Sequence, residues 1–204
     1  MSAKIQLSEE ELNLVQNAQW LLTKNTIIGK VYELFGELAH EWRNRLNGQP
    51  APVKLQATLL QPGPKISKGE NYNGLPWVML DYPRVFGKED VFAVRTMFWW
   101  GHFLSVTLHL KGTYKQQYST LLLNNLPLLA QHDFYLCISE DEWRHEFAED
   151  NYLLLSQLSS GEVEKIWQAS DFCKLSAKIS LRQWNQSKDL LCALVEIIFT
   201  SLGH

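Results

Sequence analysis

The 204-residue chain has few cysteines, few glycines and prolines, and no excess of basic residues. Its three cysteines are an odd number without CxxC spacing, which argues against a disulfide framework and against a zinc knuckle. The 11 glycines and 7 prolines are too few for a collagen-like or low-complexity chain. A formal net charge of -3 lacks the basic excess that phosphate neutralisation requires, so nucleic acid is not an expected partner.

Long apolar runs and the short motifs of several enzyme classes are also missing. No stretch approaches the roughly 18 apolar residues that a membrane span needs, and residues 1–7 do not form a signal peptide. These features predict a cytoplasmic location and no membrane partner. The sequence contains no P-loop, no GxGxxG and no HExxH motif, and we expect neither a metal site nor a cofactor.

The chain does have enough apolar residues to form a sizeable hydrophobic core. It is 46% hydrophobic and 20% charged, which is typical of a globular protein rather than a disordered one. No segment is long enough to be a linker between two units. We therefore expect residues 1–204 to form a single α+β domain.

The first 48 residues carry helical signals. Ser8 and Glu11 have the spacing of a capping box, and apolar residues follow at helical intervals. Asn25-Thr26 predicts the start of a second helix, which Asn47-Gly48 ends. The sequence therefore predicts an N-terminal helical hairpin.

After this region the apolar pattern changes to a period of two, which is typical of half-buried strands. Because most of these strands follow one another directly, we expect an antiparallel sheet of about six strands with helices packed on one face. The Pro- and Gly-rich residues 61–74 predict a loop. The expected strands are residues 53–59, 77–82, 91–99, 103–111, 134–139 and 172–184. The expected later helices are residues 113–129 with a kink or a stop near 124–125, part of 140–157, 162–169 and 190–202.

The turn between the third and fourth expected strands determines which residues share a face. A two-residue turn at Trp100-Gly101 places Arg95 among apolar residues, where an unpaired charge is costly. A three-residue turn, with Gly101 at positive φ, places Arg95 on the opposite face from the core. We expect the second register.

This register predicts a polar sheet face that contains several cationic and aromatic side chains. Such a face is a plausible platform for a small anionic ligand, because Arg grips carboxylate or phosphate and aromatic rings stack on flat groups. The candidate ligand-binding residues are Trp77, Asp81, Arg95, Trp99, Ser105, Thr107, His109, Lys178 and Arg182. The same face is expected to carry Lys54, Gln56, Thr58 and Lys174.

Other interpretations of this face remain open. Polar strand rows are routine on antiparallel sheets, so the face can simply be solvated. An enzyme of hydrolase or transferase type would use a pocket formed by Asp81, Arg95 and His109, with residues 61–74 as a lid, although no GxSxG motif supports a hydrolase. Alternatively, two copies of the chain bury the face or its aromatic edge in a homodimer. The charged residues 140–146 are interpreted as helix-capping chemistry rather than as a site.

Overall fold

The computed structural model describes residues 5–48 and 57–203 of the chain. Seven strands form one antiparallel sheet in the order β1-β2-β3-β4-β7-β5-β6. The strands are β1 (Lys65–Tyr72), β2 (Leu75–Phe86), β3 (Val91–Trp99), β4 (Phe103–Lys111), β5 (Tyr135–Cys137), β6 (Tyr152–Leu154) and β7 (Phe172–Ser180). The expected α+β class with an antiparallel sheet is confirmed, with one more strand than the six expected.

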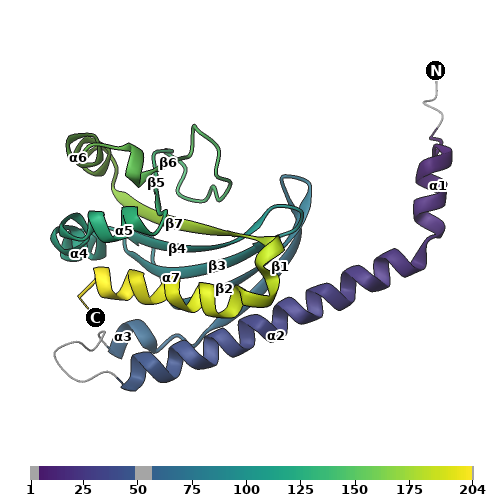
Figure 1. Ribbon diagram of the computed structural model, residues 1–204, viewed down its shortest axis with the longest axis horizontal. Coiled ribbons are helices and arrows are strands. Elements are labelled where there is room, and N and C mark those ends of the chain that lie inside the picture. The colour runs from purple at the N-terminus through teal and green to yellow at the C-terminus, as the bar shows by residue number, and fades with distance from the viewer. Residues whose placement is uncertain (1–4, 49–56, 204) are drawn as a thin grey trace.

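Helices cover one face of this sheet (Figure 1). The helices are α1 (Glu9–Gln16), which lies away from the sheet, α2 (Ala18–Gly48), α3 (Ala57–Leu60), α4 (Thr113–Asn124), α5 (Leu126–Gln131), α6 (Ser160–Ala169) and α7 (Ser187–Ser201), with 3₁₀ turns η1 (Leu155–Gln157) and η2 (Leu181–Gln186). The kink or stop expected near residues 124–125 is confirmed as the break between α4 and α5.

The main core lies between the sheet and these helices. On α2, the fully buried side chains Val31, Phe35 and Leu38 follow a helical repeat and belong to the same core cluster as Val106 and Leu108 of β4. Burial of each large apolar side chain contributes roughly 1.5–3 kcal/mol, and this layer holds most of them. The alternating apolar rows seen in the sequence therefore determine which face the helices cover.

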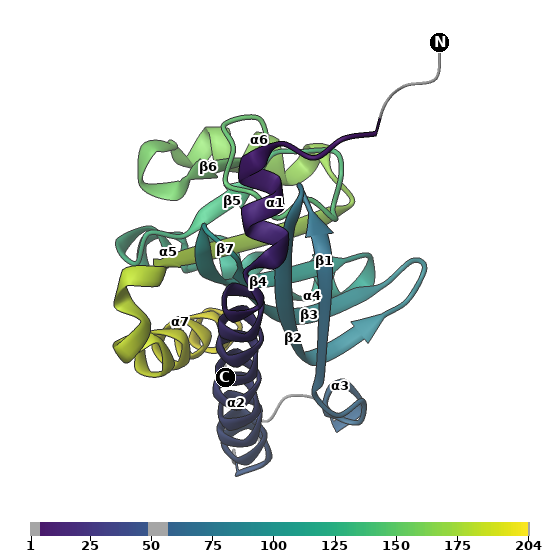
Figure 2. The ribbon, with the colours of Figure 1, turned by 90° about the vertical axis from the view of Figure 1, so that its right-hand side faces the viewer.

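The expected N-terminal helical hairpin is wrong in two respects. The break falls at Asn17 rather than at Asn25, because the Asn17 side chain accepts a hydrogen bond from the Trp20 amide and caps α2. At the expected break, the Thr26 hydroxyl donates to the Leu22 carbonyl and the helix continues. In addition, α1 does not fold back along α2 but leads away from the body (Figures 1 and 2). The Ser8–Glu11 capping box is confirmed.

The segment before the second expected strand also differs from the prediction. Residues 65–72, expected as part of a loop, form edge strand β1, paired with β2. Of the expected strand 53–59, Lys54 and Gln56 lie outside the described residues, and Thr58 lies in helix α3. The Gly and Pro signals were misleading, because an edge strand tolerates both. Gly69 lies directly opposite Trp77, and a Cβ there would come within 2.6 Å of the indole.

The charged segment after β5 is not the expected partial helix. Residues 138–151 form an irregular loop, called here the covering loop, which lies over the sheet on the side away from α2 and α7 (Figure 1). It is followed by β6 rather than by more helix. Because its polar groups bond to the sheet, the loop needs no helix to satisfy them.

Candidate functional site

The turn between β3 and β4 has the expected three-residue form. Gly101 has φ of 76°, and Arg95 pairs with Thr107 in the register that the sequence predicted. Phe98 and Leu104 accordingly join the helix-side core, and the Arg95 side chain extends from the other face. The predicted polar row is therefore present. Whether it can bind a ligand depends on how much of it the rest of the chain covers.

The middle of this polar face is buried by the chain itself. Thr107, His109, Lys174 and Ser176 are each at most 4% exposed, beneath the covering loop. The Thr107 and Ser176 hydroxyls bond to each other at 2.7 Å. Along these four residues the face of β4 and β7 is therefore neither solvated nor an open platform, although Lys178 near the end of β7 is exposed. Over β1, β2 and β3 the face is more open.

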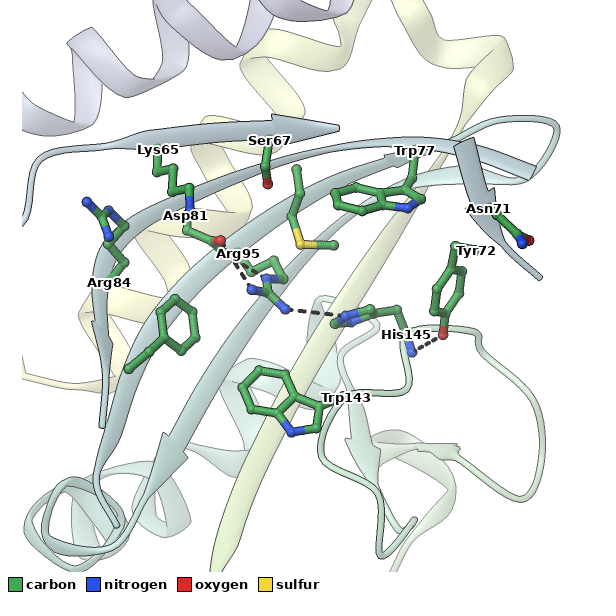
Figure 3. A pocket seen from close by; sticks show the side chains of 12 residues that line it. Lys65, Ser67, Asn71, Tyr72, Trp77, Asp81, Arg84, Arg95, Trp143 and His145 are labelled. Atoms are coloured by element: carbon green, nitrogen blue, oxygen red, sulfur yellow. Dashed lines mark hydrogen bonds and ion pairs between the residues drawn. The ribbon is translucent and has the colours of Figure 1, made fainter. Parts of the chain in front are cut away.

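There, a groove of about 480 Å³ lies between the sheet and the covering loop (Figure 3). A β-bulge between Asp81 and Arg84 shifts the register, so that even-numbered Arg84 and Phe86 share the face of odd-numbered Asp81. The groove is lined by Lys65, Ser67, Asn71, Tyr72, Trp77, Met79, Asp81, Arg84, Phe86 and Arg95 from the sheet, and by Trp143 and His145 from the covering loop.

Arg95 occupies the centre of the groove. Its Nε and Nη2 donate to the two Asp81 carboxylate oxygens at 2.7 and 3.1 Å. Its guanidinium carbon lies 5.4 Å from the centre of the Phe86 ring, and Nη1 lies 3.3 Å from Nε2 of His145. These contacts fix the planar guanidinium in one orientation, with its charge partly compensated by Asp81.

His145 is held as a neutral ring. Burial, together with Lys174, Arg95 and His109, lowers the pKa of His145 well below its usual value. Because Arg95 can only donate, Nε2 of His145 must accept, and Nδ1 therefore carries the proton. The lone pair that would serve as a general base is directed at Arg95.

The position of His145 is set from β1. Its amide donates to the Tyr72 hydroxyl at 2.6 Å, and that hydroxyl donates in turn to Glu146. Burial and the Glu146 carboxylate raise the pKa of Tyr72 to about 12, so the hydroxyl keeps its proton at neutral pH. Tyr72 thus ties the covering loop to the wall of the groove.

His109 does not join Asp81 and Arg95 in this groove. It is buried under the covering loop, where its Nε2 lies 2.9 Å from a Glu142 oxygen, and Glu142 also accepts from Lys111 at 2.8 Å. Burial, with Lys174, Arg95 and Lys111 nearby, lowers the pKa of His109 to about 3. Asp81 is bonded to Arg95 instead. His109 therefore helps to hold the covering loop against the sheet.

The other candidate residues are dispersed. Trp77 lines the groove, whereas Trp99 is buried beside it and donates to the Tyr72 carbonyl at 3.2 Å. Ser105 is buried on β4. The Lys178 ammonium lies over the rings of Phe147 and Tyr135. Arg182 is exposed on η2, because a capping box at Ser180 ends β7 before it.

Sequence reasoning missed the contributions of Lys65, Tyr72, Arg84 and Phe86, and those of Trp143 and His145 on the loop. Period-two alternation over residues 65–67 was a usable signal for β1, but Pro and Gly residues obscured it. No local pattern marks the loop residues. Their position follows from contacts with a strand more than 70 residues earlier, such as the one between His145 and Tyr72.

Among the described residues, no three His, Cys, Asp or Glu side chains gather closely enough to hold a metal ion. Within the same residues, no helix combines the length and the apolar character needed to cross a membrane. Comparison of the sequence with protein-family models and with curated proteins yields no match. A function for this chain therefore has to be inferred from the geometry and charge of the groove.

Proposed function

We propose that the protein binds a small organic anion with a flat or sugar-like ring in the groove between β1, β2 and the covering loop. The observation that carries this proposal is the joint presence of three cationic side chains, one carboxylate and four aromatic rings around one cavity. Its volume of about 480 Å³ falls within the range of small-molecule sites, roughly 300–1,000 Å³.

Two of the cations are available to a ligand. Arg84 uses Nε to donate to the Gly63 carbonyl at 2.7 Å, which leaves its terminal nitrogens for an anion. Lys65 is exposed, and within the described part of the chain neither side chain forms an ion pair. Arg95, fixed by Asp81, supplies a third donor at the centre of the cavity. An acidic group near Lys65 and Arg84 would therefore meet favourable charge.

The aromatic rings supply a place for the ring of the ligand. Figure 3 shows Trp77 and Trp143 on opposite sides of the groove, with the Arg95 guanidinium between them. Trp143 is 49% exposed, so part of its indole is free to contact a ligand. A flat group lying against either indole would bury apolar area while its acidic group stays near the cations.

Binding is favoured over catalysis at this site. The enzyme alternative used Asp81, Arg95 and His109, but His109 is not among the groove residues. The histidine that does line the groove, His145, directs its lone pair at Arg95. We propose a cytoplasmic location as well, supported by three free and buried cysteines.

The test is calorimetric titration with ring-bearing anions and their uncharged counterparts: adenosine monophosphate against adenosine, and benzoate against benzamide. We expect at least one anion to bind and its counterpart to bind at least about tenfold more weakly, since a charge-assisted hydrogen bond contributes about 1.5–3 kcal/mol. Equal binding of both members of every pair, or no binding by any, contradicts the proposal.

The matched control uses two residues of the same strand. Lys65→Gln removes a groove cation, whereas Lys68→Gln removes an exposed lysine of β1 outside the groove. We expect the first to weaken anion binding severalfold and the second to leave it unchanged. Equal losses in both variants would mean that general charge, rather than the groove, attracts the ligand.

A further inference from the structure

The N-terminal segment carries apolar side chains that contact little of the rest of the chain. Residues 5–22, called here the arm, comprise α1 and the first turns of α2 and are exposed throughout. Trp20 is 49% exposed and Leu22 is 58% exposed. The large apolar residues exposed on the arm are Ile5, Leu7, Leu12, Leu14, Val15, Trp20, Leu21 and Leu22. So much clustered apolar surface is typical of an interaction site.

The arm continues the buried stripe of α2. Trp20 lies seven residues before Ile27, and Leu21 lies seven residues before Ile28, so each pair shares one side of the helix. Ile27 and Ile28 pack against the main core, but Trp20 and Leu21 lie beyond the end of the sheet. Figure 1 shows α2 projecting past the sheet at this end. The apolar stripe of α2 therefore extends beyond the part of the helix that packs against the sheet.

An apolar groove lies beside the base of the arm. It is lined by Ile27 of α2, Phe98 and Trp100 at the β3–β4 turn, and Leu181 and Trp184 of η2, with Lys30 at its edge. We call it the end groove, and its volume is about 460 Å³. Trp100 and Trp184 both meet the Phe98 ring edge-on and remain half-buried.

We infer that the arm of one copy of the chain occupies the end groove of a second copy, in reciprocal exchange about a two-fold axis. Trp20 and Leu21 cannot reach the end groove of their own copy, because they belong to the same continuous helix that lines it. The arm and the end groove lie next to each other on one copy. A two-fold axis that passes close to them therefore brings the arm of each copy to the end groove of the other.

Area and charge both support a second copy as the occupant. Eight exposed apolar side chains at roughly 100 Å² each offer at most about 800 Å² per arm, which is comparable to the area that each partner contributes to a standard interface. Helix α1 of the arm begins with Glu9 and Glu10, whereas Lys30 lines the end groove and exposed Arg182 follows the lining residue Leu181. The acidic first turn also disfavours an anionic membrane surface as the partner.

The decisive test uses two single-cysteine variants, since the three native thiols are buried. Tagged Leu14→Cys protein is mixed with untagged Lys30→Cys protein and treated with a short bis-maleimide. We expect a cross-linked species that contains one chain of each kind, because the arm of one copy lies near the groove of the other. Lys88→Cys, on an exposed turn, is the control partner. Cross-linking no stronger with Lys30→Cys than with Lys88→Cys overturns the inference.

A second measurement does not depend on cross-linking. Light scattering across a dilution series should give twice the chain mass of 23.6 kDa, with a Kd in the micromolar range or below. The double variant Trp20→Gln, Leu21→Gln should weaken the dimer at least about tenfold without lowering the melting temperature of the monomer. A monomer at every concentration, a dimer unaffected by this variant, or a monomer that instead sediments with neutral phospholipid vesicles would each refute the proposed exchange.

Discussion

The two faces of the sheet are covered in different ways. On one face, helices bury an apolar layer in which Phe35, Leu38 and Leu108 are fully enclosed. On the other, the covering loop buries a polar row that includes His109 and Lys174. The apolar layer depends on close packing and does not titrate, whereas hydrogen bonds and ion pairs depend on distance, direction and protonation. We therefore expect the faces to respond differently to substitution and to pH.

The largest effect is expected on the helix-covered face. Phe35→Ala leaves a cavity where the ring is fully buried, and such truncations cost about 3–5 kcal/mol of the free energy of unfolding. Urea unfolding, monitored by circular dichroism, measures the loss. Ile28→Ala, at a half-buried position on the same helix, should cost clearly less. A loss below about 1 kcal/mol for Phe35→Ala would mean that this layer is not the main core.

The next effect is specific to the polar face and depends on pH. Because the pKa of His109 is about 3 in the fold and about 6.5 when unfolded, the unfolded chain binds more protons between these values. Stability is therefore retained above pH 6.5 and lost as the pH falls towards 3. Between pH 7 and pH 5, His109 should lower the free energy of unfolding by about 2 kcal/mol. Attraction between Glu142 and the protonated His109 ring makes this loss smaller.

Urea unfolding at pH 7, 6 and 5 checks this prediction, with His109→Gln as the comparison. The amide of Gln keeps a donor for Glu142 but does not titrate, so the decline with pH should be shallower in the variant. His145, whose pKa is also lowered, continues to contribute in both proteins. Identical slopes would exclude His109 as a source of the acid sensitivity.

A smaller and more local effect is expected in the covering loop. Arg144 bonds to Glu146 at 2.6 Å and to both Asp150 oxygens at 3.0 Å, and these contacts hold the loop in its shape. Arg144→Ala should lower the free energy of unfolding only slightly, because solvent screens ion pairs at this partly exposed site. Hydrogen exchange should quicken at residues 138–151 and stay unchanged in α2. Uniformly faster exchange would indicate that the loop is not a separate unit.

The smallest effect on stability is expected at Gly69. An added Cβ would meet the rigid Trp77 indole at 2.6 Å, so the ring must shift, while the strand gains about 0.5–1 kcal/mol from losing a glycine. Gly69→Ala should thus leave the melting temperature nearly unchanged but move the indole NMR signal of Trp77. The signals of Trp42 and Trp167, on the helix-covered side, serve as internal controls. An unmoved Trp77 signal would contradict the close approach.

Much of the fold could be predicted because its signals are local. Strands β3 and β4 have the bounds that alternation indicated, and the three-residue turn at Gly101 follows from the cost of burying Arg95 among apolar residues. The misplaced helix break has a local reason as well. Asn17 and Asn25 look alike in sequence, and the capping bond to Trp20 distinguishes them.

The candidate site was predicted only in part. Trp77, Asp81 and Arg95 line the groove, but Ser105, Thr107 and His109 are covered by residues that the sequence placed in a helix. The bulge after Asp81 adds Arg84 and Phe86, which lie beyond the end of the expected strand 77–82. A bulge changes the parity of every later residue in its strand, so alternation alone cannot detect it.

The sequence by itself determined the apolar stripes and rows, and through them which face of each element meets the helices. That choice is local, because a period of two or of 3.6 residues sorts side chains by face before any distant contact forms. Only the tertiary structure decided that the covering loop would bury the polar row and that a groove would stay open over β1–β3. That outcome depends on contacts such as Tyr72 with Glu146 and His109 with Glu142, which join residues remote along the chain and leave no periodic trace in it.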